Sequence, residues 1–409
     1  MLAKVAFAAA LLFACEGAGM AQAPLCSAIM KLVEKTAAGD TVSPLFIPSY
    51  EPGDDEAGLP LPIAGSAFSY DNALAIMALV SCNEVHAAKR IGDAFLAAIA
   101  SDRTFKDGRV RNAYRAGIVK PGPVPLPGWW DAEHNVWAED AYQDGTQTGN
   151  VAWVGLALLA LEQASGDGRY REAAKGLARW ITNNTLEDRP PAGLTGGMAG
   201  FDASQTAIRW KSTEHNLDAY ALGVWLVRNA TDSSVHELVK ATRSFLDAMF
   251  DPIQGGFRLG TLPDGRSQPP DMYALDALIW PLVGVSTPPT AWRRSLSIAK
   301  DHLAVSGGYD FNGDRDGLWT EGTAQVALVE RALGNRREAD RLLGVIDHLR
   351  APSGLLYATG RGQISTGLSI GDTSKEADFF YFHRPHLGAT AWAILAQRGL
   401  NPFTGERVD

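Results

Sequence analysis

The chain of 409 residues is 46% hydrophobic and 20% charged, which is enough to bury the core of one large domain or of two ordinary ones. Its formal net charge is −9 and it contains no long basic run, which argues against binding to nucleic acid. An acidic surface suits a neutral or cationic substrate.

The N-terminus has the pattern of an export signal. Lys4 precedes an apolar run over residues 5–14 that is too short to cross a bilayer, and small residues follow before Pro24. We expect residues 1–23 to be a signal peptide, residues 24–409 to form a single domain, and the product to be periplasmic or secreted. A lipoprotein anchored through Cys15 is the alternative, although the bulky Phe13 disfavours it. No later segment predicts a membrane span.

Two kinds of predicted helix alternate along the chain. Helices that are apolar on every face, and therefore expected to be buried, cover residues 70–80, 150–161, 218–227, 273–283, 324–333 and 388–397. Amphipathic helices with a charged face for solvent cover residues 84–99, 170–181, 235–250, 292–305 and 337–349. The sixth buried helix lacks a downstream partner, which residues 26–37 can supply. The order predicts an all-α fold, an (α/α)6 barrel of six helix hairpins.

Glycine-rich connectors mark the repeat at intervals of 37 to 59 residues, near Gly108, Gly145, Gly196, Gly255, Gly307 and Gly354. A period of this length built from helix pairs indicates a repeat architecture. We expect the connectors to form short extended pieces at one end of the barrel. All the buried helices then begin at that end.

Cleavage of the signal leaves two cysteines, Cys26 and Cys82. The barrel places both at the end opposite the connectors, since Cys26 starts the N-terminal outer helix and Cys82 ends the first buried helix. We expect a disulfide between them in an oxidising compartment, and two unpaired, partly buried thiols are the alternative.

Acidic and polar residues gather at the starts of the buried helices. Asp71, Glu214, Asp218 and Glu321 are candidate catalytic carboxylates, and Tyr70, His215, Tyr273, His383 and Arg384 are candidate substrate-binding residues beside them. Taken singly, an acid at a helix start is more often a cap or a first-turn residue. Glu214 and Asp218 are spaced i, i+4 on one helix face, and like charges so placed raise one pKa, as a general acid requires. Asp276 also falls inside an apolar run, where an unpaired carboxylate is costly.

Tryptophans add a second signal. Trp129, Trp130 and Trp137 lie in a proline-rich loop, Trp210 precedes Glu214, and Trp319 precedes Glu321. Flat rings stack on sugar faces, so these five are candidate substrate-binding residues. Packing of the loop onto the barrel is the competing interpretation.

The stretch "DFNGDRDG" has oxygen ligands at alternate positions, Asp310, Asn312, Asp314 and Asp316, as at the start of a calcium loop. Thr323 stands where such a loop needs a closing Glu. We therefore expect an Asx-rich turn and no cofactor, with calcium at these four residues as the alternative. No zinc-like spacing links His215, His383 and His386, so no metal site is predicted.

The hairpin pattern, together with "YDNALAI", "TGNVAWVGLALLALEQASGDGRY", "STEHNLDAY" and "EGTAQVAL", resembles the six-hairpin glycosidase-like, (α/α)6-barrel superfamily over nearly the whole mature chain. No single family with a known substrate can be assigned, and the fold alone does not give function. The resemblance implies an acid and a base across the barrel mouth. We therefore expect Glu214 to be the general acid and Asp71, Asp218 or Glu321 the base, at the separation of ~6.5–9.5 Å of an inverting enzyme.

The leading hypothesis is an exported, monomeric glycoside hydrolase acting on a poly- or oligosaccharide. A polysaccharide lyase is the first alternative, in which His or Tyr of "YFHRPH" removes a proton and Arg384 holds a uronate carboxylate. A non-catalytic glycan-binding protein of an exopolysaccharide system is the second.

Overall fold

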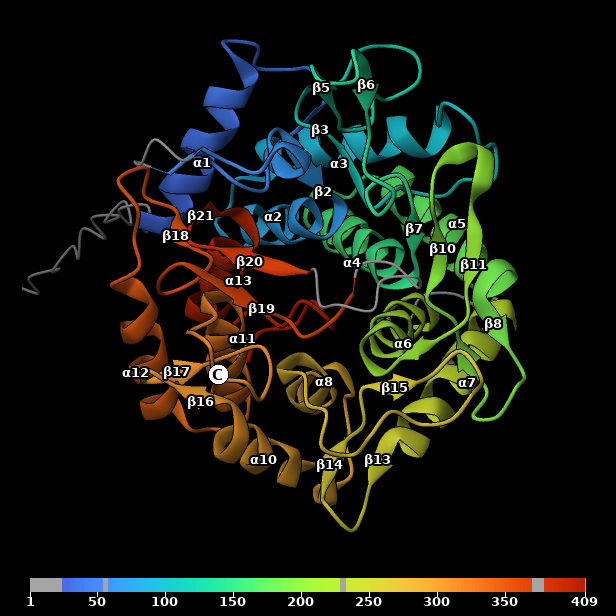
Figure 1. The fold of residues 1–409 in the computed structure, drawn as a ribbon, viewed down its shortest axis with the longest axis vertical. Coiled ribbons are helices and arrows are strands. Elements are labelled where there is room, and N and C mark those ends of the chain that lie inside the picture. The colour runs from blue at the N-terminus through green and yellow to red at the C-terminus, as the bar shows by residue number, and fades with distance from the viewer. Residues whose placement is uncertain (1–23, 54–57, 229–232, 370–378, 409) are drawn as a thin grey trace, which may run out of the picture.

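The computed structural model describes residues 24–53, 58–228, 233–369 and 379–408. The signal peptide predicted for residues 1–23 lies outside the described residues. In the rest, helices dominate and form a barrel with an inner and an outer layer, seen end-on in Figure 1. None of the described helices combines the length and apolar character needed to cross a bilayer.

The inner layer consists of helices that are buried on nearly every face. In chain order it contains α2 (Ser69–Ser81), α4 (Thr148–Ser165), α6 (Thr213–Val227), α8 (Leu275–Ile279) followed by α9 (Pro281–Gly284), α11 (Thr320–Ala332) and α13 (Leu387–Arg398). Each packs against the next, and α13 closes the ring on α2. Burial on all sides explains why these segments carry no polar stripe.

The outer layer consists of amphipathic helices, each bound to the inner helix before it. In chain order it contains α3 (Val85–Ala100), α5 (Gly168–Thr185), α7 (Ser233–Met249), α10 (Arg294–Leu303) after a 3-10 turn (Thr290–Arg293), and α12 (Arg336–Asp347). The N-terminal helix α1 (Pro24–Ala37) packs on α13 and α2, as predicted for the partner of the last inner helix.

One inner helix differs from its prediction. Residues 273–283 were expected to form one helix, but α8 begins only at Leu275 and gives way to α9 at Pro281. Pro281 has no N–H to continue the hydrogen-bond ladder, and its ring crowds the preceding turn. Tyr273 therefore lies in the connector before the helix.

The connectors carry short antiparallel strands, most in two-stranded sheets. Those joining successive repeats are β2 (Ser66–Phe68) with β3 (Ala113–Arg115), β7 (Thr146–Gln147) with β10 (Gly197–Ala199) and β11 (Thr206–Ile208), β12 (Lys211–Ser212) with β15 (Gly260–Thr261), and β18 (Leu356–Tyr357) with β21 (Pro385–His386). The others are β1 (Leu45–Phe46) with β4 (Gly117–Ile118), β5 (Trp129–Asp131) with β6 (Val136–Ala138), β8 (Leu186–Glu187) with β9 (Gly193–Leu194), β13 (Phe250–Asp251) with β14 (Gly256–Phe257), β16 (Ala304–Val305) with β17 (Gly308–Tyr309), and β19 (Gln363–Ser365) with β20 (Phe380–Phe382).

A repeated backbone hydrogen bond holds the inner helices to the connectors. The N–H of the first residue of each inner helix donates to a carbonyl of the next connector, and the last one returns to the first: Ser69 to Asn112, Thr148 to Gly196, Thr213 to Leu259, Leu275 to Phe311, Thr320 to Ala358 and Leu387 to Ser49. These N–H groups have no partner inside their helices, so the connectors satisfy them. All the inner helices therefore start at one end of the barrel.

The opposite end of the barrel is closed by aromatic packing. Trp153, Trp280 and Trp392 contact one another with ring centroids 5.4 to 5.8 Å apart, and Phe403 of the C-terminal segment packs on all three. Asn401 fixes that segment through a hydrogen bond to the carbonyl of Val283. The barrel is thus a cup with a floor.

The disulfide predicted between Cys26 and Cys82 is present, with the two Cα atoms 6.0 Å apart. Cys26 lies in the first turn of α1, and Cys82 caps the C-terminus of α2. The bond joins the two helices at the end away from the connectors.

Candidate functional site

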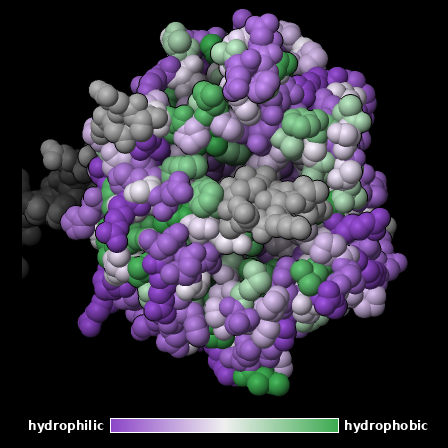
Figure 2. Space-filling model, in the orientation of Figure 1, coloured by the Kyte–Doolittle hydropathy of each residue, from purple (hydrophilic) through white to green (hydrophobic). Residues whose placement is uncertain are grey.

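A cavity of about 550 Å³ opens at the end of the barrel where the inner helices start. Its walls combine aromatic rings with carboxyl groups from several helices, the usual composition of a ligand pocket. Hydrophilic residues occupy most of the circumference of this face, and hydrophobic residues reach the surface nearer its centre (Figure 2). The connectors and the first turns of the inner helices therefore build the candidate site.

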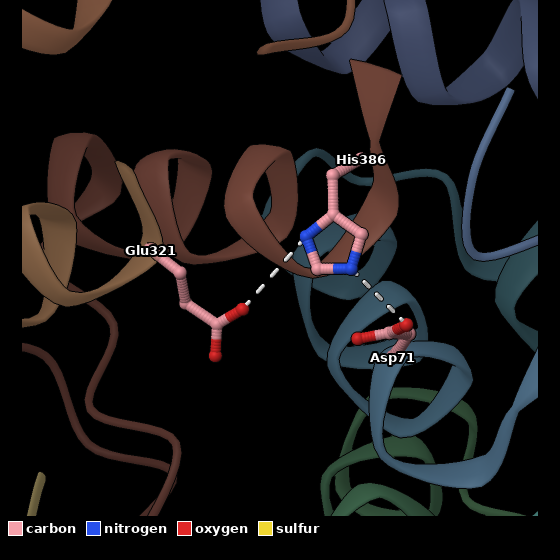
Figure 3. Close-up of side chains that lie close together, drawn as sticks. All are labelled: Asp71, Glu321 and His386. Atoms are coloured by element: carbon pink, nitrogen blue, oxygen red, sulfur yellow. Dashed lines mark ion pairs between the residues drawn. The ribbon is translucent and has the colours of Figure 1, made fainter. Parts of the chain in front are cut away.

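One cluster in this cavity joins three inner helices. Asp71 of α2 and Glu321 of α11 lie on either side of His386, the residue that caps α13 (Figure 3). The His386 Nε2 lies 3.4 Å from Asp71 Oδ2, and its Nδ1 lies 3.9 Å from Glu321 Oε2. All three side chains are almost fully buried.

The imidazole of His386 has two alternative states. Its Nδ1 accepts the Ala389 N–H at 3.2 Å, which fits a neutral ring with the proton on Nε2, facing Asp71. Burial lowers the pKa of this imidazole, but the charges of Asp71 and Glu321 outweigh burial and raise the pKa above its ordinary value. A second proton on Nδ1 would break the cap bond and turn this nitrogen into a donor toward Glu321 Oε2.

Glu321 is held as a neutral acid. Its Oε1 accepts the Tyr70 hydroxyl at 2.7 Å, and Tyr70 in turn accepts the indole N–H of Trp392 at 2.8 Å. Its Oε2 has no hydrogen-bond partner within the described residues. Burial raises the pKa of Glu321 to about 8, because an isolated charge is costly in a dry site.

A second cluster lies on α6 and α8. Glu214 hydrogen-bonds to Asp276, and Asp218 lies one turn further along α6. Burial, followed by the charges of Asp276 and Asp218, raises the pKa of Glu214 well above its ordinary range. Burial also raises the pKa of Asp276, to about 6. Two carboxyls that share a hydrogen bond cannot both ionise readily, so Glu214 carries the proton at neutral pH.

Asp218 does not line the cavity. Its carboxyl is fully buried, and burial followed by the charge of Asp276 raises its pKa well above the ordinary value. Gly149 of α4 packs against it, because a Cβ there would lie 3.2 Å from Asp218 Oδ2. The predicted i, i+4 pair therefore has only Glu214 facing the cavity.

His215 and Trp210 form part of the wall next to Glu214. The rings lie 5.4 Å apart, and Ser212, the N-cap of α6, accepts the His215 N–H. Burial lowers the pKa of His215 to about 4, so the ring is neutral at pH 7. Trp319 also lines the cavity, although only 1% of it is exposed to solvent.

Other predicted substrate-binding residues lie elsewhere. Trp129, Trp130 and Trp137 form the β5–β6 hairpin, where Trp130 and Trp137 pair across the strands and are 55% and 44% exposed, outside the cavity lining. His383 stacks on Tyr357 at 4.1 Å and is also outside.

Arg384 is the sharpest departure from the prediction. Its guanidinium donates to the carbonyls of Gly58 and His383, and the residue is absent from the cavity lining. Tyr273 lines a neighbouring cavity instead, with its ring 4.9 Å from that of His302.

The acidic loop at residues 310–316 forms a series of Asx-type turns. The buried carboxyl of Asp310 accepts the N–H groups of Phe311 and Gly317, and Asn312 accepts that of Asp314. The carboxylate of Asp314 accepts the N–H of Asp316, and the Asp316 carboxylate in turn accepts the N–H of Ser365. Oxygens of Asp310, Asp314 and Asp316 lie within 4.8 Å of one another, which leaves the calcium alternative open.

Sequence analysis missed several tyrosines of the site. Tyr50 stacks on His386 at 4.3 Å, and Tyr142 and Tyr381 line the same cavity. They come from connectors, where no periodicity signals which side chains turn inward. Asp276 carried a signal, since it is an acid inside an apolar run, but it was not chosen as a catalytic candidate.

The cavity is acidic. It is lined by Asp71, Asp140, Glu214, Asp276 and Glu321, and among its described lining residues Lys211 is the single lysine or arginine. The Lys211 ammonium donates to the carbonyls of Arg189 and Pro191 and pairs with Glu187 at 3.2 Å. No lysine or arginine of the described lining is therefore available to hold an anionic ligand.

Comparison with known proteins gives a fold and no family. No family model matches the chain, and no curated protein matches it. Solved structures do match. A glycosidase variant is 14% identical over 91% of this chain and 97% of its own, with a TM-score of 0.58. A novel alpha-amylase from Clostridium perfringens is 11% identical over the same shares, with a TM-score of 0.58. A GH76 alpha-mannanase from Bacteroides thetaiotaomicron is 12% identical over 91% and 94%, with a TM-score of 0.56.

These similarities establish the glycosidase-like (α/α)-barrel fold over nearly all of the chain, in agreement with the resemblance found in the sequence. Identities of this size carry the fold alone.

Proposed function

We propose that the protein is an exported glycoside hydrolase that cleaves a poly- or oligosaccharide with inversion at the anomeric carbon. The observation that carries the proposal is one cavity containing two kinds of carboxyl group. Burial, followed by the charge of Asp276, raises the pKa of Glu214 well above its ordinary range, and Asp71 Oδ2 lies 3.4 Å from the Nε2 of His386. Solved structures of this fold include an alpha-mannanase, an alpha-amylase and a glycosidase in complex with glucose, which support a carbohydrate substrate.

Glu214 is suited to act as the general acid. A carboxyl that stays protonated at neutral pH can give its proton to the glycosidic oxygen as the bond breaks. Burial, followed by the charges of Asp276 and Asp218, produces this state. Before the transfer, Asp276 accepts the hydrogen bond of the protonated Glu214, and the proton then goes to the glycosidic oxygen, which leaves as a hydroxyl group.

Asp71 is suited to act as the general base. It lies on α2, which is separated from α6 by α4 in the inner ring, so acid and base stand on different walls of the cavity. Water activated by Asp71 would give its proton to this carboxylate and attack the face opposite the leaving group, and the Nε2 of His386, 3.4 Å from Asp71 Oδ2, would orient the carboxylate. Glu321, with its raised pKa, and Asp218, behind the wall, are less suited to this role.

The acidic cavity favours an uncharged glycan over a uronate polymer. A lyase needs a cation to hold the uronate carboxylate, and Arg384 is engaged with backbone carbonyls outside the cavity. A lyase stays the alternative, because Tyr and His side chains that could remove a proton are present at the site. Analysis of the products distinguishes the two reactions.

We also propose the finer architecture given by the sequence. Residues 24–409 would form one domain, a six-hairpin (α/α)6 barrel, after removal of residues 1–23. The Cys26–Cys82 disulfide is compatible with an extracellular protein and supports export to the periplasm or medium. N-terminal sequencing of the secreted protein and light scattering would test cleavage and the expected monomer.

The test is a panel of α-glucans, β-glucans, mannans and uronate polymers. Mass spectrometry shows whether water was added to the products, and proton NMR of the anomeric proton shows the configuration of the new reducing end. We expect addition of water, inverted anomers, and a loss of kcat of about 100-fold or more in Glu214→Gln and Asp71→Asn. Unsaturated products without added water would establish the lyase. Binding without turnover would establish a glycan-binding protein.

A further inference from the structure

A second cavity of about 290 Å³ lies beside the acidic one. Five residues line both cavities: Leu259, Ala274, Phe311, Thr366 and Leu368. The two spaces are therefore neighbours, divided by the side chains of the connectors that follow β14, β16–β17 and β19. No part of this second cavity is needed for the acid and base chemistry.

The lining of the second cavity has the chemistry of a sugar subsite. Tyr273 supplies a half-buried ring, which His302 holds from one side at 4.9 Å. Asp271 supplies an exposed carboxylate, and Asn312 an amide that is fixed by its bond to the Ser365 carbonyl. An aromatic face with nearby hydrogen-bonding groups matches the apolar face and hydroxyls of a pyranose.

The charge of this lining also selects among glycans. Its described residues include Asp271 and no lysine or arginine, like the acidic cavity apart from the engaged Lys211. A chain bearing carboxylate or sulfate groups would be repelled by the Asp271 carboxylate and would find no lysine or arginine in the described lining of the second cavity. Uncharged sugar units meet no such repulsion.

We infer that the second cavity is a further subsite, so that the enzyme takes an uncharged oligosaccharide chain running from the acid-lined cavity past Phe311 to Tyr273. This inference rests on the proposed function for the location of the cleaved bond. The subsite itself requires only binding. It gives Tyr273 a substrate-binding role at a distance from the reacting carbon.

The experiment measures kcat/KM for a series of neutral oligosaccharides of increasing length, taken from the glycan that wild type hydrolyses. For wild type we expect kcat/KM to rise with length and then level off. In Tyr273→Ala the ratio of kcat/KM for the longest to the shortest substrate should fall about tenfold, and Tyr273→Phe should retain it. If the ratio in Tyr273→Ala equals that of wild type, whatever the loss of activity at each length, the inference is overturned.

Tyr357→Ala is the matched control. Tyr357 is also a half-buried ring packed on a histidine, but it lies outside both cavities, so its replacement should leave the length dependence unchanged. If wild type hydrolyses no glycan, the proposed function fails. The subsite is then tested by calorimetric titration with neutral α-glucan, β-glucan and mannan oligosaccharides of increasing length, where affinity for at least one series must rise with length in wild type and not in Tyr273→Ala.

Discussion

At the scale of single residues, the surroundings of Glu214 decide its protonation. The folded-state pKa of Glu214 is raised above its unfolded value. The neutral carboxyl therefore contributes its full stability below the unfolded pKa, and the protein loses this stability as the pH rises through the folded pKa. Glu214→Gln cannot ionise. We expect the variant to melt close to wild type at pH 5 and at a higher temperature than wild type at pH 9.

Thermal melts at the two pH values check this prediction. Glu237→Gln is the control, because Glu237 is exposed on α7 and its replacement should shift both melts alike. A Glu214→Gln difference that does not change with pH would mean that Glu214 ionises normally.

Gly388 shows how closely the site is packed. A Cβ at this position of α13 would lie 2.5 Å from Asp71 Oδ1 and 2.9 Å from Glu321 Oε2, so the two carboxyls rest against bare backbone. Gly388→Ala should displace both acids and lower kcat/KM about 100-fold, the cost of a misplacement near 1 Å. Gly344→Ala on α12, where nothing lies within 4 Å, should retain full activity. Equal activities of the two variants would contradict this role for Gly388.

At the scale of elements, asparagines hold the connectors to the inner helices. Asn216 of α6 accepts the Leu194 N–H and donates to the Leu194 carbonyl, and Asn72 of α2 makes the same pair of bonds with Ile47. This repeated clamp sets the height at which each connector crosses the barrel mouth.

Asn216→Ala leaves two buried backbone groups of Leu194 without partners. We expect a loss of unfolding free energy of about 2–4 kcal/mol, since each buried unsatisfied group costs about 1–3 kcal/mol. Urea denaturation measures it. Asn184→Ala, which removes a partly buried bond within α5, is the milder control. A smaller loss for Asn216→Ala than for the control would show that the clamp is not structural.

At the scale of the whole molecule, the disulfide ties the N-terminal helix α1 to the C-terminal end of α2. The crosslink spans 56 residues, and loop-closure entropy gives it a stabilisation of about 4 kcal/mol. The double variant Cys26→Ser, Cys82→Ser should lose stability of this order in denaturant and keep its activity, because the bond lies at the end away from the cavity. Wild type treated with a reductant should behave in the same way. Full stability after reduction would contradict the prediction.

The barrel could be predicted because its signals are periodic. Helices such as α4 are apolar on every side, their partners are amphipathic, and glycine-rich connectors recur between them. The break at Pro281 was missed because an apolar pattern continues across it. Sequence patterns locate helices better than they locate the ends of helices.

The site could be predicted only in part. Asp71, Glu214 and Glu321 could be placed at the cavity because each lies in the first turn of an inner helix, and all these helices begin at the same end. Trp130 and Arg384 lie outside the cavity lining, because residue type gives no information on the direction of a connector side chain. The same limit hid Tyr50 and Tyr381, which only tertiary packing turns inward.

The aromatic floor of the cup has an optical consequence. Trp153 and Trp280 line the cavity and pack against Trp392 and Phe403, and the indole N–H of Trp280 has no hydrogen-bond partner within the described residues. Indole emission responds to hydration and to new hydrogen bonds. A sugar that reaches the floor would therefore change the intrinsic fluorescence of the protein, and occupancy of the cavity could be followed by light, without a label and before any substrate is known.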